Sequence, residues 1–350
     1  MTLSDVTVSI EVQQSSASAG YGIPAYFVPG DTNTYKEYST LESIQAAYKP
    51  ADSVYGFATE YFAQPDHPQV MAVITFADLE EAMKLFDNKG WYFAILADEA
   101  MTKDIKPQND TKVLTLSNII ESSQYRMMIV LDRYANADAI ASDDVLKGSL
   151  DGNERTILMV KKSSTATASD AQRLDAALVG RYGAYTVGSL NWHDLIAPTM
   201  TADDWDAISL NAILKSGSMA FVNKANNVAQ TTSGVTMSGQ YIDVIMGIDW
   251  TGSNIKASLQ NILTQSNKVP YDQAGIALLK ATVEGVLAKA YTNGIIDADD
   301  AGQASYSVTA KDRSEMRESD QQARVFTGLS YQYVPANAID QIKVFGAINM

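Results

Sequence analysis

The sequence of 350 residues contains no cysteine, which excludes disulfide bonds, thiolate metal ligands and a cysteine nucleophile. Histidine is almost as rare: His67 lies in a proline-flanked loop, and His193 follows Trp192. The two are far apart in sequence and do not form a metal-binding pair. No Gly-x-Ser-x-Gly segment exists to supply a serine nucleophile for either. We therefore expect both histidines to be structural or surface residues.

Phosphate-binding motifs are also missing. No Gly-x-Gly-x-x-Gly follows a strand pattern, and no Gly-Lys-Ser or Gly-Lys-Thr occurs, so neither a dinucleotide nor a nucleoside triphosphate has a recognisable site. Ser253 and Lys256 have a Ser-x-x-Lys spacing, but the companion motifs of that enzyme class are absent. Both positions suit the first turn of an amphipathic helix. We expect no cofactor.

Positive charge is scarce relative to negative charge. The chain has 26 Lys and Arg against 41 Asp and Glu, a net charge of -15. This balance disfavours nucleic acid and anionic membranes as partners, because both are bound through clustered basic residues. No apolar run reaches the roughly 18 residues that span a bilayer, and the N-terminus lacks a signal-peptide pattern. We therefore expect the chain to be synthesised in the cytoplasm and not to insert into a membrane.

Acidic residues gather in two places where a general acid and base or a hard cation would be conceivable. The first group suits the start of a helix, because carboxylates favour the positive end of the helix dipole; it comprises Asp203, Asp204 and Asp206. The second group suits a solvated loop and lacks the pattern of a calcium-binding loop; it comprises Asp297, Asp299 and Asp300. We expect no metal site at either.

Strands and helices alternate through the central part of the chain. A strand at 70–76, a helix at 78–86 and a strand at 91–96 form a β-α-β pattern. Continuous apolar strands separated by helices predict an α/β body with a mixed sheet covered on both faces. Further segments fit the same scheme: helices at 39–48 with a Ser39 capping box, 54–62, 113–122, 169–179 and 202–215, strands at 127–131, 156–160 and 218–222, and a hairpin at 228–241.

The last hundred residues predict a separate domain of two helices and closing strands. One helix follows Trp250, and a longer helix spans 272–291 and ends at Gly294. Two strand-like runs then follow, at 325–334 and 339–348. These runs either close a hairpin within one domain or pair with the sheet of a neighbouring copy.

The N-terminus carries a strict period-two pattern. Apolar Val6, Val8, Ile10 and Val12 alternate with polar residues, which predicts a strand with one buried face. Residues 13–22 are rich in Ser, Ala and Gly, the composition of a flexible tether. The predicted organisation is therefore an arm and tether at 1–22, an α/β body at 23–240, with subdomains near 23–100 and 101–240, and a C-terminal domain at 241–350 with its own strand arm.

Three segments, in this order, resemble the contractile tail sheath proteins of bacteriophages in their short form. The first runs from the Tyr38-Ser39-Thr40-Leu41-Glu42 segment through Gln64-Pro65 to Pro68, with one extra residue before Pro68. The second is the Trp91-Tyr92-Phe93-Ala94-Ile95-Leu96 strand. The third includes Tyr241-Ile242-Asp243, Asp249-Trp250, Val269-Pro270-Tyr271, Arg324 and Ala338-Ile339.

The resemblance implies a non-enzymatic subunit that forms stacked hexameric rings around a tail tube. Its terminal arms would add strands to neighbouring sheets, and contraction would drive the tube through the host envelope during genome ejection. Implied partners are further copies, the tube, baseplate and tail terminator proteins, in a tail assembled in the host cytoplasm. The implied arm residues are Val6, Val8, Ile10, Val12, Val325, Leu329, Tyr331, Ile342, Val344 and Phe345.

Lys256, Lys280 and Lys289 are candidate contacts with an acidic tube, with solvated helix faces as the alternative explanation. Two other functions stay open on the sequence alone. One is a different tail component, from the tube or the baseplate. The other is a cytoplasmic hydrolase that uses an acidic pair.

Overall fold

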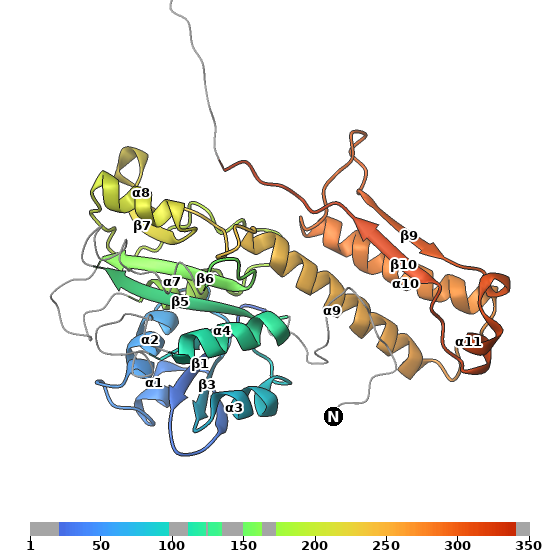
Figure 1. The fold of residues 1–350 in the computed structure, drawn as a ribbon, viewed down its shortest axis with the longest axis horizontal. Coiled ribbons are helices and arrows are strands. Elements are labelled where there is room, and N and C mark those ends of the chain that lie inside the picture. Colours follow the sequence, from blue (N-terminus) through green and yellow to red (C-terminus); the bar gives the residue numbers. More distant parts are fainter. Residues whose placement is uncertain (1–20, 98–110, 124, 135–149, 163–172, 341–350) are drawn as a thin grey trace, which may run out of the picture.

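The chain forms a layered α/β body from which an elongated C-terminal domain projects (Figure 1). A computed structural model describes residues 21–97, 111–123, 125–134, 150–162 and 173–340. The predicted strand at 5–12 and most of the run at 339–348 lie outside these residues. Within the described ranges, no helix is both long and apolar enough to cross a membrane.

The described residues of the body form an eight-stranded sheet in the order β2-β3-β1-β4-β5-β6-β7-β8. The six central strands are parallel, and antiparallel β2 and β8 form the two edges. The strands are β1 (Pro24–Pro29), β2 (Thr34–Tyr38), β3 (Met71–Phe76), β4 (Phe93–Leu96), β5 (Met127–Tyr134), β6 (Thr156–Lys162), β7 (Met219–Asn223) and β8 (Ala229–Thr231).

Helices cover both faces of this sheet, as the apolar strands predict. Alternate residues of β1 enter different cores: Tyr26 packs with α2 and α7, whereas Phe27 packs with α3 and α4. The α/β fold class is confirmed. The body helices are α1 (Leu41–Gln45), α2 (Ser53–Phe62), α3 (Leu79–Phe86), α4 (Thr111–Ser123), α7 (Leu174–Tyr182) and α8 (Ala207–Lys215), with a short 3₁₀ turn at Ala225–Asn227.

The strand β1 lies inside the sheet, third in the strand order, although its sequence did not predict it. It is six residues long and has proline at each end, which weakens the strand pattern. It pairs with both β3 and β4 and thus separates the two strands of the predicted β-α-β unit. That unit exists, but its strands are not neighbours.

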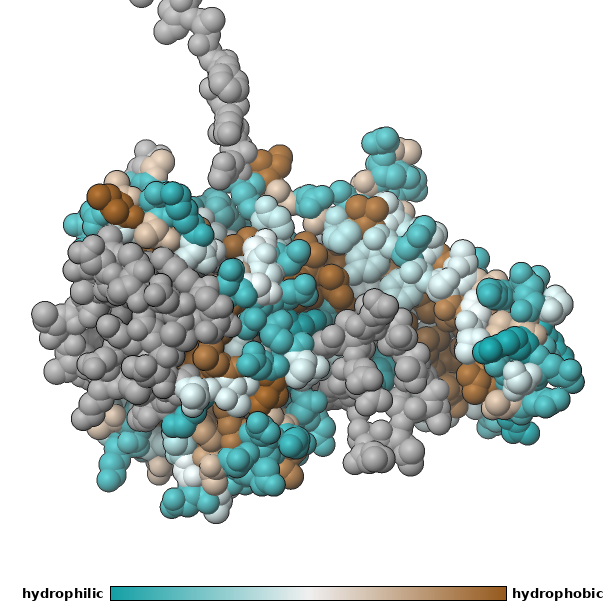
Figure 2. Space-filling model, in the orientation of Figure 1, coloured by the Kyte–Doolittle hydropathy of each residue, from teal (hydrophilic) through white to brown (hydrophobic). Residues whose placement is uncertain are grey.

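The C-terminal domain begins with α9 (Ile242–Gln265), which starts within the core of the body and runs outward (Figure 1). α10 (Gln273–Thr292) packs beside α9, and a two-stranded ribbon of β9 (Tyr306–Ala310) and β10 (Leu329–Tyr333) packs on α10. Between the strands, a 3₁₀ turn (Arg313–Glu315) and α11 (Glu318–Gln322) form an exposed tip. Figure 2 shows that hydrophilic residues dominate this tip.

Three predicted helix starts are wrong, each because a neighbouring contact takes precedence. Thr40, not Ser39, caps α1 by accepting a hydrogen bond from the Ser43 amide. Asp206 caps α8, because Asp203 is drawn into an ion pair with Lys161. α9 begins at Ile242 rather than after Trp250, since burial of Ile242, Ile245 and Met246 outweighs the weak helix propensity of β-branched residues.

The predicted strand pairings are only partly described. β10 pairs antiparallel with β9, an element missed in the sequence, whereas most of the run at 339–348 lies outside the described residues, so its pairing stays a prediction. Residues 325–328 precede the strand and are not part of it. In the predicted hairpin at 228–241, β8 pairs with β7, and only an isolated bridge joins Val235 to Tyr241.

The cap of α10 gives a direct test of this domain. The Asp272 carboxylate accepts hydrogen bonds from the amides of Ala274 and Gly275, both at 3.0 Å. We expect Asp272→Ala to lower the free energy of unfolding by about 1 kcal/mol, since these amides would lose their acceptor. Urea denaturation would measure the change. Asp300→Ala, in an exposed loop, is the control, and an equal effect of both substitutions would contradict the capping role.

Candidate functional site

The ribbon of β9 and β10 presents two open edges. Each strand pairs only with the other among the described residues. Its inner face is apolar: Val308 is buried, and Leu329, Tyr331 and Tyr333 are half-buried against the core. Its outer face carries uncharged polar residues, with the hydroxyls of Thr309 and Ser330 2.7 Å apart. Within the described part of the chain, the ribbon is therefore held on one face, and no further strand pairs with either of its edges.

Backbone donors point outward from these edges. The Lys311 amide donates to the Gly328 carbonyl at 2.9 Å, and the Val334 amide donates to Ser305 at 3.0 Å. In an antiparallel ladder, hydrogen-bonded residue pairs alternate with pairs that are not hydrogen-bonded. Val308 and Tyr331 face each other as a pair of the second kind, so their amides are directed away from the partner strand. Each edge thus carries groups that an added strand would satisfy.

The edges of the body sheet are different. β2 carries the charged residues Lys36 and Glu37, and β8 is only three residues long. Charged residues and short length are two ways in which proteins prevent unwanted strand pairing. Neither ribbon strand contains a charged residue or a proline. The sheet edges suited to pairing are therefore those of the C-terminal domain.

A buried ion pair joins this domain to the body. Asp249 of α9 accepts hydrogen bonds from both terminal nitrogens of Arg155, at 2.8 and 2.9 Å, and from the Tyr92 hydroxyl at 2.8 Å. Asp249 is 1% exposed and Tyr92 is fully buried. Tyr92 and Arg155 stand just before β4 and β6, so the contact lies at the amino ends of the parallel strands. Ligands of open α/β sheets usually bind at the opposite ends.

The junction is electrostatically satisfied. Burial disfavours the charged form of Arg155, but the Asp249 carboxylate outweighs this effect and raises the net pKa of Arg155. Burial, followed by the Asp249 charge, also raises the pKa of the Tyr92 phenol well above its usual range. Arg155 is therefore a stable cation and Tyr92 a neutral donor across the range in which proteins function. The three residues hold a fixed geometry and supply no titrating catalytic group.

Two glycines allow a second contact between body and C-terminal domain. Gly188 has a φ of 95°, and a Cβ atom there would lie 2.7 Å from the Asn293 carbonyl oxygen. Gly294 follows α10 with a φ of 85°, and its Cβ would lie 2.7 Å from the Gly188 oxygen. Side chains would clash with backbone at both positions. The end of α10 is thus seated directly on the 188 loop.

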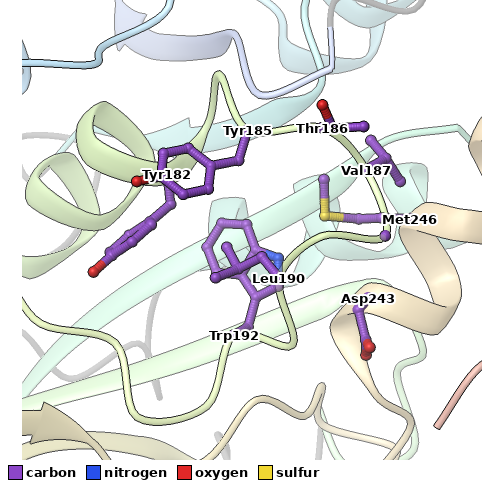
Figure 3. A pocket seen from close by; sticks show the side chains of 9 residues that line it. Tyr182, Tyr185, Thr186, Val187, Leu190, Trp192, Asp243 and Met246 are labelled. Carbon is purple, nitrogen blue, oxygen red and sulfur yellow. The ribbon is translucent and has the colours of Figure 1, made fainter. Parts of the chain in front are cut away.

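A small cavity lies where the loop after α7 meets the first turn of α9 (Figure 3). Tyr182, Tyr185, Trp192, Asp243 and Met246 are among its lining residues. Its volume of about 10 Å³ is the minimum for one water molecule. The cavity is therefore too small to serve as a substrate site.

Asp243 also borders a second, polar cavity with Asn191 and Asp340. The side-chain amide of Asn191 donates to Asp340 at 3.0 Å, which ties residue 340 to the body. One oxygen of Asp243 is buried without a hydrogen-bond partner. Burial raises the pKa of Asp243, and the nearby Asp340 charge raises it further.

The sequence-predicted arm residues are only partly described. Val6, Val8, Ile10, Val12, Ile342, Val344 and Phe345 lie outside the described residues, so their role stays a prediction. Leu329 and Tyr331 belong to β10, whereas Val325 precedes it and is 49% exposed. The Val325 carbonyl accepts a hydrogen bond from Tyr271 at 3.1 Å.

The three predicted tube-contacting lysines are not brought together on one face. Lys280 and Lys289 are nine residues apart on α10, about half a turn out of phase. Lys280 pairs with Glu284 at 3.6 Å, and the Lys289 ammonium lies 5.9 Å from the Trp250 ring. Lys256 lies on α9. Their contact with a tube stays a prediction, and one flat surface would meet at most one of the α10 lysines.

The other candidate groups have structural surroundings. His193 lies 3.1 Å from Asp194, and the His67 ring packs against Tyr61 and Phe62. Asp299 accepts hydrogen bonds from amides of its own loop. The Ser253 hydroxyl contacts the Asp249 carbonyl at 2.8 Å. Among the residues that the structure describes, no group of three or more potential metal ligands is present.

Comparison with known proteins gives a consistent picture. Residues 242–348 match the family model described as E217 tail sheath protein gp31-like, C-terminal domain. The anti-feeding prophage helical sheath in its contracted state has a TM-score of 0.69 at 12% identity, covering 99% of this chain and 100% of that one. No curated protein matches the sequence.

The chain has the fold of a contractile tail sheath protein. The sheath complex of the extracellular contractile injection system PVC, also contracted, has a TM-score of 0.70 at 12% identity, covering 100% of this chain and 99% of that one. The sheath tail protein Lin1278 from Listeria innocua has a TM-score of 0.54 at 8% identity, covering 93% of this chain and 97% of that one. The predicted resemblance to the sheath family is confirmed, and the sheath fold extends over essentially the whole chain.

Sequence reasoning did not find the ion pair that joins the two parts of the sheath fold. In the sequence, Asp249 stands out only as part of the resemblance to sheath proteins, and no pattern marks Arg155. The two residues are 94 positions apart, so no local pattern connects them. A signal does exist, because a lone Asp inside the apolar stretch Ile245–Trp250 of a helix requires a buried partner.

Replacing one member of the junction should be more harmful than replacing both charged members. We expect Asp249→Leu or Arg155→Met alone to cost about 3–5 kcal/mol in free energy of unfolding, since each leaves a buried charge unpaired. The double variant should lose much less than the sum. Tyr92→Phe, which removes one charge-assisted hydrogen bond, should cost about 1.5–3 kcal/mol. A urea-denaturation cycle gives these values, and strict additivity would contradict the coupling.

Asp243 should make stability depend on pH. Its pKa is raised in the folded protein, so the stability that its protonated form contributes is present below the unfolded pKa of about 3.9 and lost as pH rises through the folded pKa. Asp243→Asn should therefore raise the free energy of unfolding at pH 7 and change it little near pH 4. Asp300→Asn is the exposed control. Equal effects of Asp243→Asn at both pH values would refute this expectation.

Proposed function

We propose that this chain is the sheath subunit of a contractile phage-like tail or injection system, and that it has a structural rather than an enzymatic role. The observation that carries the proposal is the uncharged ribbon with two open edges, in a domain that matches a tail sheath family model. The sheath fold of the whole chain supports the same conclusion. The polar junction also supports it, because its groups hold two parts together and include no base or nucleophile poised for reaction.

In this function the subunits form stacked hexameric rings around a tail tube. Strand 5–12 and the C-terminal run that includes Ile342, Val344 and Phe345 add to ribbon edges of neighbouring copies. Backbone hydrogen bonds provide adhesion, and the alternating apolar side chains set the register. Further partners are the tube, the baseplate and the tail terminator, and the tail assembles in the host cytoplasm.

Contraction follows from the same architecture. The body and the first turns of α9 share one core and a buried ion pair, so they move as one unit. The strand links between copies supply the hinges. Two packings of one subunit separated by a barrier release energy without a nucleotide.

A baseplate component is the second candidate. A structure titled as the anti-feeding prophage baseplate matches 100% of this chain with a TM-score of 0.67 at 13% identity. A baseplate subunit would form closed rings or complexes of fixed size. A sheath subunit polymerises without a limit on length, so the two assemblies are distinguishable in the electron microscope.

The arm assignment can be tested by placing the same charge on either face of strand 5–12. We expect Ile10→Asp to abolish polymer formation, because it would bury a carboxylate against the neighbouring ribbon. Ser9→Asp, on the polar face, should be tolerated. Deletion of residues 1–12 should leave a folded subunit that does not polymerise. Negative-stain electron microscopy at rising concentration, with circular dichroism to verify folding, would measure these effects. Normal tubes from the truncated chain would refute strand exchange through this arm.

A further inference from the structure

Tyr21, the first described residue, is fastened to both parts of the protein. Its ring packs against Tyr92 with centroids 5.0 Å apart. Its hydroxyl lies 2.7 Å from the Ser253 hydroxyl on α9. The Ser253 hydroxyl also lies 2.8 Å from the Asp249 carbonyl and 3.2 Å from the Trp250 carbonyl, which can only accept, so Tyr21 can donate to Ser253 while Ser253 donates to the helix. Burial raises the pKa of Tyr21 well above its usual range, so this donor keeps its proton.

Gly22 supplies a second point of attachment. Its φ is 79°, and a Cβ atom there would lie 1.7 Å from the carbonyl oxygen of Gly183, which follows α7. No other residue type fits this close backbone contact without a shift. The next residue enters the sheet, where the Ile23 carbonyl accepts a hydrogen bond from the Tyr92 amide at 2.8 Å. The backbone is thus fixed on either side before β1 begins.

We propose that Tyr21 is a positioning residue that fixes the root of the N-terminal arm, residues 1–20, to α9 beside the Tyr92-Asp249-Arg155 junction. The inference rests on the proposed function, in which the arm binds a neighbouring copy. To that function it adds two details: the arm leaves the subunit at Tyr21, and α9 is the helix that resists tension on the arm.

The contact of Tyr21 with Ser253 mainly determines the direction in which the arm leaves the subunit and the element on which tension in the arm acts. Releasing residues 21–23 would lengthen the tether only slightly, and the entropic cost of such lengthening is small. Without the root, however, tension on the arm would act directly on β1, which pairs with β3 and β4 inside the sheet. With it, tension passes through Ser253 to α9, a 24-residue helix anchored by a buried ion pair.

A purely structural role would affect stability, whereas a positioning role affects the orientation of the arm. Tyr21→Phe keeps the ring and removes the hydrogen bond, and Ser253→Ala removes the same bond from α9. Tyr21→Ala removes both contacts. Tyr241→Phe, at an exposed tyrosine near the start of α9, is the matched control.

Because the chain has no cysteine, spin labels can be placed at Ser18→Cys and Ala257→Cys without other substitutions. Electron–electron double resonance on the unassembled protein then measures the spread of distances between the arm root and α9. We expect the distribution in the parent and control proteins to be narrower than that with Tyr21→Phe or Ser253→Ala, and the broadest distribution with Tyr21→Ala. No broadening with Tyr21→Ala would overturn the proposal.

Polymerisation of the unlabelled variants completes the test. We expect Tyr21→Phe and Ser253→Ala each to raise the subunit concentration required for tubes by up to about tenfold, because losing a bond that orients the arm can cost assembly at most about the free energy of one hydrogen bond, while Tyr241→Phe has no effect. Unchanged tube formation by Tyr21→Ala would refute the role in assembly. If the parent protein forms no tubes at all, the proposed function fails, whereas the distance measurement still decides whether Tyr21 anchors the arm root.

Discussion

The buried contact of Asp249 with Arg155 and Tyr92 is the interaction on which the arrangement of this protein depends. An isolated carboxylate in the interior would be strongly unfavourable, and here a bidentate guanidinium and a phenol satisfy it. Such a pair need not add net stability, because desolvation offsets the Coulomb attraction. Its geometry is specific, however, and an apolar contact of the same area would tolerate sliding. The pair therefore fixes the angle at which α9 leaves the body.

α9 carries more than this one contact. Asp243 in its first turn borders the cavity that contains Asp340, Asp249 binds the body, and Ser253 binds Tyr21. These positions span about 15 Å along the helix. Tyr21 is therefore held by α9 itself, whereas Asp340 is held by Asn191 of the body beside the first turn of this helix; these are the points at which the two terminal segments join the described structure. A rotation of the body about a neighbour would move both attachment points together.

The distribution of charge along strand edges separates the two parts of the molecule. The body closes its sheet with a charged edge strand and a very short one, which limits unwanted pairing. The ribbon strands have no charged residue and are five residues long. Their apolar face packs on helices, so only their backbone edges are exposed for pairing. This contrast is the one that the proposed addition of strands between subunits would use.

The sequence alone determined the elements whose signals are local. Central parallel strands such as β3 and β6 are buried on both faces, so their continuous apolar residues predicted them, and α10 was predicted from its apolar stripe and its end at Gly294. Tertiary structure decided the partners of these elements. It placed β1 between β3 and β4, paired β10 with β9, and moved the start of α8 to Asp206 when Lys161 bound Asp203. Helix caps and side-chain periodicity act over a few neighbouring residues. Strand order and buried ion pairs depend instead on which distant segments exclude water together, and no local pattern records that choice.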